Sequence, residues 1–239
     1  MINPDERQVM SEQTQSSAPA ETAINDSATT PAQHPLWAAL TTGHDLPVYG
    51  VADGAANAYI HAHLQAHDVP HRALYQDKGL PEEQSPWLFP LTQKETYSEW
   101  YLQESPGQYW GILIVTPLSL VELAEHLHDY LTMQDEQGKL HLMRFYDPRV
   151  IKAYLDALTM AQSQGFFKPG LQLWADAPGQ AQTMYHYVQH QSVQRQAQHA
   201  QADQSQIHIN TQQSDRHYRR TPVDLRVIAP DCDEEECAC

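Results

Sequence analysis

The sequence lacks most of the features that identify an enzyme or a membrane protein. Its three cysteines, Cys232, Cys237 and Cys239, all lie near the end, so no disulfide can cross-link the rest of the chain, which fits a reducing compartment. No window approaches the roughly 20 apolar residues that cross a bilayer, and the N-terminal region has no apolar signal-peptide centre. Gly-x-Ser-x-Gly, Walker and Gly-x-Gly-x-x-Gly motifs are missing as well. These absences favour a cytoplasmic protein without catalytic activity or a cofactor.

Basic residues are also scarce. The 239 residues include 14 Lys and Arg but 30 Asp and Glu, which gives a formal net charge of −16. Nucleic-acid binding relies on clustered Lys and Arg, so this balance argues against a nucleic-acid partner. Residues 1–35 carry five acids and one arginine, and the last nine residues carry five acids, so the two ends account for nine of the sixteen net charges. The middle of the chain is only moderately acidic, and its charge does not indicate any particular class of partner.

Composition divides the chain into three parts. Residues 1–35 are rich in Ser, Thr, Ala, Pro and Gln and hold few large apolar side chains, so we expect a disordered tail. Residues 36–178 contain enough apolar residues for one packed domain. Residues 179–239 are expected to form a polar, Gln-rich and partly helical arm that ends in an acidic tail containing the cysteines, with little fixed structure after Thr211.

Within residues 36–178, strand patterns alternate with helix patterns. Trp110–Val115 is continuously apolar and rich in β-branched residues, which predicts a strand covered on both faces at the centre of a sheet. This alternation predicts an α/β fold with a mixed β-sheet flanked by helices. The other expected strands are 46–52, 71–75, 86–91, 130–133, 140–146 and 171–174. Helices are expected to begin at Asp53 or Gly54, near Lys94, at Thr116-Pro117 or alternatively at Ser119 with Glu122 as a capping box, and at Asp147.

Fourteen histidines invite a search for a metal site. His63 and His67 lie one helical turn apart and could bind one ion, whereas histidines two residues apart on a helix point away from each other. Both fall on the apolar face of their expected helix, where a buried imidazole is more common than a metal ligand. The terminal cysteines have no histidine partner or second cysteine pair, which is a weak zinc pattern. We therefore expect no metal.

Three charged residues could have either a catalytic or binding role or a structural one. Asp53 and Asp147 end expected strands and could act as paired acids, but the simpler interpretation is that each caps the following helix. Arg144 lies in an otherwise apolar expected strand, on the same face as Tyr146, and is interpreted as the ion-pair partner of Asp53 or Asp147. Alternatively, it shapes a partner groove or binds a partner carboxylate. The predicted partner-binding or structural corner consists of Asp53, Gly54, Arg144, Tyr146, Asp147, Pro148 and Arg149.

Three strings resemble one known family. Tyr49–Ala55, Trp110–Ile114 and Arg144–Val150, taken with their order and spacing, are similar to the Tap/TEC-type adaptor chaperones of bacterial type VI secretion effectors, formerly catalogued as a domain of unknown function. The similarity spans about residues 46–175. It implies a protein that binds a toxic effector in the cytoplasm of the producing cell and brings it to the VgrG-type spike-tip protein of the secretion system.

Two other functions stay open from the residues alone. One is a metal-assisted hydrolase of unknown substrate that uses His63, His67 and Asp53, and the other is a general protein-interaction scaffold. Stoichiometric metal in the purified protein would favour the hydrolase. Neighbouring genes that encode a spike tip and a toxin would count against the general scaffold.

Overall fold

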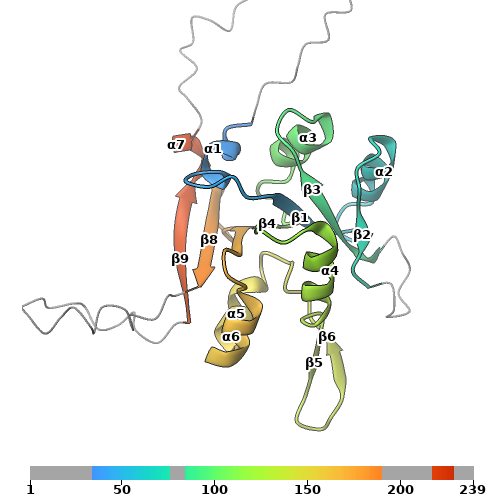
Figure 1. Ribbon diagram of the computed structural model, residues 1–239, viewed down its shortest axis with the longest axis vertical. Coiled ribbons are helices and arrows are strands. Elements are labelled where there is room, and N and C mark those ends of the chain that lie inside the picture. The colour runs from blue at the N-terminus through green and yellow to red at the C-terminus, as the bar shows by residue number, and fades with distance from the viewer. Residues whose placement is uncertain (1–33, 76–83, 190–216, 229–239) are drawn as a thin grey trace, which may run out of the picture. The chain divides into compact units, whose positions relative to one another are not determined.

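The computed structural model describes residues 34–75, 84–189 and 217–228 (Figure 1). Its strands are β1 (Val48–Asp53), β2 (Arg72–Ala73), β3 (Pro86–Leu91), β4 (Gly111–Val115), β5 (Thr132–Gln134), β6 (Leu140–Leu142), β7 (Gln172–Asp176), β8 (Thr183–Gln189) and β9 (Tyr218–Asp224). Its helices are α1 (Leu36–Leu40), α2 (Tyr59–Ala66), α3 (Thr96–Glu104), α4 (Leu120–His128), α5 (Ile151–Ala157), α6 (Met160–Phe166) and α7 (Leu225–Ile228). Seven strands form one sheet in the order β2-β3-β1-β4-β7-β8-β9, while β5 and β6 form a separate hairpin.

The predicted α/β class, a sheet flanked by helices, is confirmed, and β4 is the central strand. Successive β4 side chains enter two different cores, with Ile112 and Ile114 on one face and Leu113 and Val115 on the other. The sheet was expected to be mixed, but all strand pairings among the described residues are antiparallel. The alternation of strands and helices does not make neighbouring strands parallel here: β1 pairs with β3 and β4 pairs with β7 in antiparallel fashion although helices connect them, and β3 and β4 do not pair because β1 lies between them.

Helices cover both faces of the sheet (Figure 1). Helices α1, α2 and α3 surround one core, to which they contribute Trp37 and Ile60, and α4, α5 and α6 surround the other, to which they contribute Leu123 and Phe166. A sheet that is buried on both faces needs apolar side chains at every position of its central strands, which explains the uninterrupted apolar run of β4. In the part of the chain that the structure describes, no helix has the length and apolar character needed to cross a membrane.

The helix after β1 begins later than expected. Residues 54–58 separate β1 from α2, and the Asn57 side chain, not that of Asp53, accepts a hydrogen bond from the Tyr59 N–H (2.9 Å) at the start of the helix. Asp53 Oδ1 instead accepts the Ala55 N–H (3.0 Å) in a turn directly after the strand. The prediction that Asp53 caps the following helix is therefore wrong, because the side chain is used within its own turn.

Helix α4 begins at Leu120, so the expected start at Thr116-Pro117 is wrong and the alternative start is confirmed. The Ser119 hydroxyl accepts the Glu122 N–H (3.3 Å), and the Glu122 carboxylate accepts the Ser119 N–H (2.9 Å). This capping box satisfies two amides that a helix start would otherwise leave without partners.

The strand expected over residues 140–146 ends at Leu142. After it the chain turns, and the Asp147 N–H donates to the Arg144 C=O (2.9 Å). Arg144 and Tyr146 therefore lie in a turn, and the shared strand face predicted for them is wrong. The apolar pattern of this segment reflects burial of the turn against the core, which a hydrophobic run alone does not distinguish from a strand.

Two strands lie in the segment expected to be a partly helical arm, because β8 pairs with β7 and β9 pairs with β8. The expectation of little fixed structure after Thr211 is wrong for β9, where Tyr218 is buried. β8 buries Met184 in one core and Tyr187 in the other, and the polar residues between them hid this pattern in the sequence. The expected tail up to residue 33 and the acidic end with the cysteines lie outside the described residues. The division at residues 35 and 178 stays a prediction.

Candidate functional site

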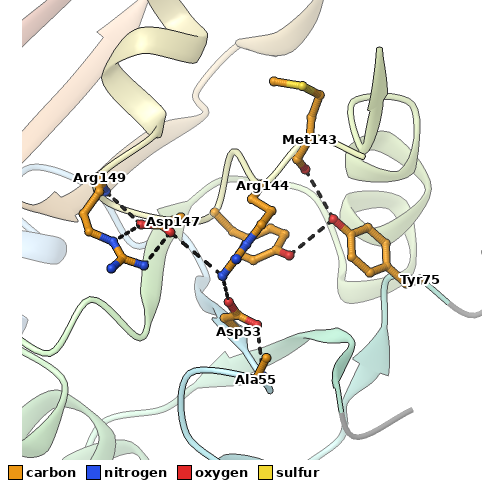
Figure 2. A network of polar contacts seen from close by, with 8 residues as sticks. Asp53, Ala55, Tyr75, Met143, Arg144, Asp147 and Arg149 are labelled. Atoms are coloured by element: carbon orange, nitrogen blue, oxygen red, sulfur yellow. Dashed lines mark hydrogen bonds and ion pairs between the residues drawn. The ribbon is translucent and has the colours of Figure 1, made fainter. Parts of the chain in front are cut away.

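Residues of the predicted corner meet where β1 ends and the turn before α5 begins (Figure 2). The backbone positions Asp53 first: its N–H donates to the Trp110 C=O (2.7 Å), next to β4. The Gly54 N–H donates to the Ser85 C=O (3.1 Å), next to β3. Central strands on both sides therefore hold this end of β1 in place before any side chain of the corner makes a contact.

A chain of alternating charges joins β1 to the turn (Figure 2). Nη2 of Arg144 forms a hydrogen-bonded ion pair with Oδ2 of Asp53 and lies 3.9 Å from Oδ2 of Asp147. Arg149 binds the same Asp147 carboxylate with Nε and Nη2, at 2.9 and 2.8 Å. We call Asp53, Arg144, Asp147 and Arg149 the ion-pair corner. The ion pair expected between Arg144 and these acids is present.

The two carboxylates of the corner are buried and the two guanidinium groups are not. The side chains of Asp53 and Asp147 are 5% and 6% exposed, whereas those of Arg144 and Arg149 are 49% and 56% exposed. A buried carboxylate is costly unless it is paired and hydrogen-bonded, and each has an arginine partner here. The corner therefore presents guanidinium groups at the surface above two buried negative charges.

Charges and burial in the corner determine its pKa values. Burial raises the pKa of Asp147, but hydrogen bonds from the side chain and backbone of Arg149, with the charges of both arginines, outweigh burial and hold this pKa below its ordinary value. Burial lowers the pKa of Arg144, and Asp53, Tyr146 and Asp147 outweigh this effect and raise it overall. Both shifts favour the charged forms of Asp147 and Arg144, which strengthens the ion pairs of the corner.

Two buried tyrosines support the turn of the corner. The Tyr146 hydroxyl donates to the Tyr75 hydroxyl (3.2 Å), which donates to the Met143 C=O (3.3 Å). Burial raises the pKa of both tyrosines, which favours the protonated hydroxyls that these hydrogen bonds use. Pro148 is buried in the same turn. No local pattern in the sequence marks Tyr75 as part of the site, because its partners lie 68 and 71 positions away along the chain.

Tyr109 is a second residue of the site that the sequence did not indicate. Its ring centroid lies 5.7 Å from the guanidinium carbon of Arg149. The backbone of Tyr109 is held by Asp176, whose Oδ2 accepts its N–H (3.2 Å). Arg149 is thus fixed by a bidentate carboxylate on one side and an aromatic ring on the other, an arrangement that suits arginine better than lysine.

The candidate metal ligands do not come together. The rings of His63 and His67 are 6.1 Å apart, and His63 stacks on Trp100 at 4.1 Å. Asp53, the third proposed ligand, is bound by Arg144. Within the described ranges, no group of three or more His, Cys, Asp or Glu residues is arranged to hold a metal ion. The terminal cysteines lie outside those ranges.

Part of the chain matches a known family model. Residues 48–165 match the family described as Domain of unknown function (DUF4123). The match begins at the first residue of β1 and ends within α6, so it includes the whole ion-pair corner and the β5–β6 hairpin. No curated protein and no solved structure matches the chain.

Proposed function

We propose, from the DUF4123 match over residues 48–165, that this protein is an adaptor chaperone of a bacterial type VI secretion system. That family is generally linked to adaptors of type VI secretion effectors and to adaptor or chaperone roles rather than catalysis. In this role the protein binds a toxic effector in the cytoplasm and loads it onto the VgrG-type spike-tip protein. The family match is the observation that carries the proposal.

The geometry of the ion-pair corner supports a binding role. Both of its carboxylates are engaged by arginines, so neither is available as a hydrolytic acid or metal ligand. The outward guanidinium groups can donate further hydrogen bonds, and a guanidinium is well suited to a carboxylate of a partner protein. No contact among the described residues favours the metal-assisted hydrolase, which requires Asp53 beside His63 and His67.

The test is to capture the tagged full-length protein from the cytosol of its native host while secretion is active, and to identify bound proteins by mass spectrometry. We expect a VgrG-type spike-tip protein and a toxin-like protein to be recovered together with it. Cells that express the tag alone serve as the control. Recovery of neither protein would contradict the proposal.

A second capture separates loading from firing. In a host whose secretion apparatus is inactivated but which still makes the spike tip, an adaptor should retain the toxin-like protein, because loading precedes secretion. If the toxin-like protein binds only when the apparatus can fire, the protein does not act as a loading adaptor in the producing cell.

A further inference from the structure

The β5–β6 hairpin exposes an unusual share of apolar surface. Figure 1 shows it projecting beyond α4, away from the seven-stranded sheet. The large hydrophobic side chains that are exposed among the described residues are Tyr59, Val121, Met133, Leu140, Leu142 and Met160, and three of these six belong to the hairpin. Leu140 and Leu142 are 67% and 43% exposed. They are two residues apart on β6 and therefore share one face of the strand.

The backbone of the same two leucines forms a free edge. At the turn end of the hairpin the Asp135 N–H donates to the Lys139 C=O (2.9 Å), and at its base the Met143 N–H donates to the Leu131 C=O (2.8 Å). Hydrogen-bonded pairs alternate along an antiparallel ladder, so the N–H and C=O groups of Leu140 and Leu142 point away from β5. No hydrogen bond to another described residue engages them.

The edges of the main sheet are protected in ways that this edge is not. At one end, β2 contains only two residues. At the other end, β9 contains Pro222. The Leu225 N–H donates to the Gln182 C=O (2.8 Å), and hydrogen-bonded pairs alternate with non-hydrogen-bonded pairs along β8 and β9. By this alternation the backbone nitrogen of Pro222 points away from β8. Short strands and outward prolines are the devices that prevent pairing with another chain. On β5, the residues whose backbone groups point away from β6 are the polar Thr132 and Gln134. Among the outer edges of the described sheet and hairpin, only that of β6 combines free backbone groups with apolar side chains.

We propose that the free edge of β6 binds an extended segment of the cargo effector, which adds to the hairpin as a third strand. This inference rests on the adaptor function proposed above. Main-chain hydrogen bonds to Leu140 and Leu142 hold the segment, and its apolar side chains at alternate positions cover the two leucines. A two-stranded hairpin is marginal by itself, and a third strand with an apolar face stabilises it.

Two other occupants fit the hairpin less well. A second copy that paired through the same edge would bury little beyond two three-residue strands, far less than the roughly 800 Å² per partner of a stable interface. Within this chain, residues 190–216 offer one alternating apolar pair, Ile207 and Ile209, in a strongly polar stretch. A segment of a larger partner has neither restriction, because it can continue past Leu142 over the domain surface.

The first test measures the affinity of the full-length chain for the toxin-like protein recovered by capture, using calorimetry with both proteins purified. Replacing Leu140→Ser together with Leu142→Ser should weaken binding about tenfold or more, because both apolar contacts are lost. Val121→Ser and Met160→Ser are matched controls, since these side chains are 46% and 57% exposed but lie on helices. The controls should bind within about twofold of the original chain. Unchanged affinity in the hairpin variant would overturn the proposal.

A proline variant separates strand addition from a simple apolar contact. Leu142→Pro removes an N–H that the hairpin itself does not use, so an unchanged melting temperature relative to Leu142→Ser is expected. Binding should be weaker for Leu142→Pro than for Leu142→Ser, because one main-chain hydrogen bond to the added strand is lost. Equal affinities of these two variants would rule out a third strand.

Photo-crosslinking identifies the occupant. A photo-reactive amino acid at the position of Leu140 should crosslink to one segment of the toxin-like protein in which apolar residues alternate with polar ones. Crosslinks to a second copy, crosslinks to Ile207 or Ile209 of the same chain, or no crosslink would each overturn the proposal. If the original chain captures no effector at all, the adaptor function itself fails; if it captures the effector and the hairpin variants do so equally well, only strand addition fails.

Discussion

Arg144 connects two buried carboxylates to the surface of the protein. Its Nη2 contacts Asp53 and Asp147, which come from segments more than 90 residues apart. Removing one partner of a buried ion pair leaves an uncompensated charge, which costs more than the pair itself contributes. The stability of the corner is therefore most sensitive to the loss of Arg144, although half of that side chain is exposed.

Arg144→Ala is expected to lower the free energy of unfolding by about 1–3 kcal/mol, because the buried Asp53 carboxylate loses its charged partner. Chemical denaturation followed by circular dichroism measures this change. Arg226→Ala is the matched control: Arg226 also pairs with an aspartate, but its side chain is 68% exposed and that of Asp224 is 34% exposed. Such exposed pairs contribute about 0–1 kcal/mol.

A double variant identifies the cause of that loss. Asp53→Asn in the Arg144→Ala background should restore part of the stability, because the neutral amide removes the buried charge. We also expect Arg144→Ala and Asp147→Ala to weaken effector delivery by disturbing the turn before α5. A variant that kept both its thermal stability and its partner affinity would show that the corner does not have this role.

At the level of elements, two glycines allow β1, β3 and β4 to pack closely. A Cβ atom at Gly111 would lie 1.9 Å from the backbone oxygen of Val51, in the paired strand. At Gly50 it would lie 2.4 Å from the ring of Phe89 in β3. The first contact is with the backbone of β1, which cannot move without disturbing its hydrogen bonds to β4. Gly111 is therefore needed for the close approach of β1 and β4 and not for a turn.

Gly111→Ala is therefore expected to destabilise the protein more than a conventional core substitution. Ile112→Val, at the next position of β4, is the control and should cost about 0.5–1.5 kcal/mol. Equilibrium denaturation of both variants gives the comparison. If Gly111→Ala were as stable as the original chain, the β1–β4 register would be wrong.

At the level of the whole molecule, the C-terminal strands complete the core. Tyr187 of β8 and Tyr218 of β9 lie in the same core as α4, α5 and α6, and Met184 of β8 lies in the opposite one. The DUF4123 match ends at residue 165, before β7. Strands outside the matched region therefore cover apolar surface of strands within it.

Truncation tests where the folded unit ends. A chain that stops at residue 178, the domain boundary expected from composition, should lose its cooperative thermal transition, because β8 and β9 are removed and both cores are opened. A chain that stops at residue 228 retains every described element and should melt like the full-length protein. A cooperative, unchanged transition in the shorter chain would instead support the boundary at residue 178.

Sequence periodicity determined the elements that are apolar and local. The strands β1, β3, β4 and β7 were predicted close to their observed positions, because burial on both faces leaves continuous apolar runs and turns leave polar breaks. Strands β8 and β9 were not predicted, because partly exposed strands carry polar residues on one side. The predicted start of α2 was wrong, because the side chain of an aspartate after a strand can accept a hydrogen bond within the turn that follows the strand as easily as at the start of a helix.

The ion pair of Arg144 was predicted in outline from the sequence, since a lone charge in an apolar stretch requires a partner. The sequence left Asp53 and Asp147 open as that partner. The tertiary structure alone decided that Asp53 makes the hydrogen-bonded pair, and that Tyr75 and Tyr109 lie beside the corner. Contacts across many tens of residues leave no local pattern in a single sequence. The free edge of β6 was likewise decided only by the tertiary structure, because whether a strand has a neighbour depends on how the whole sheet is assembled.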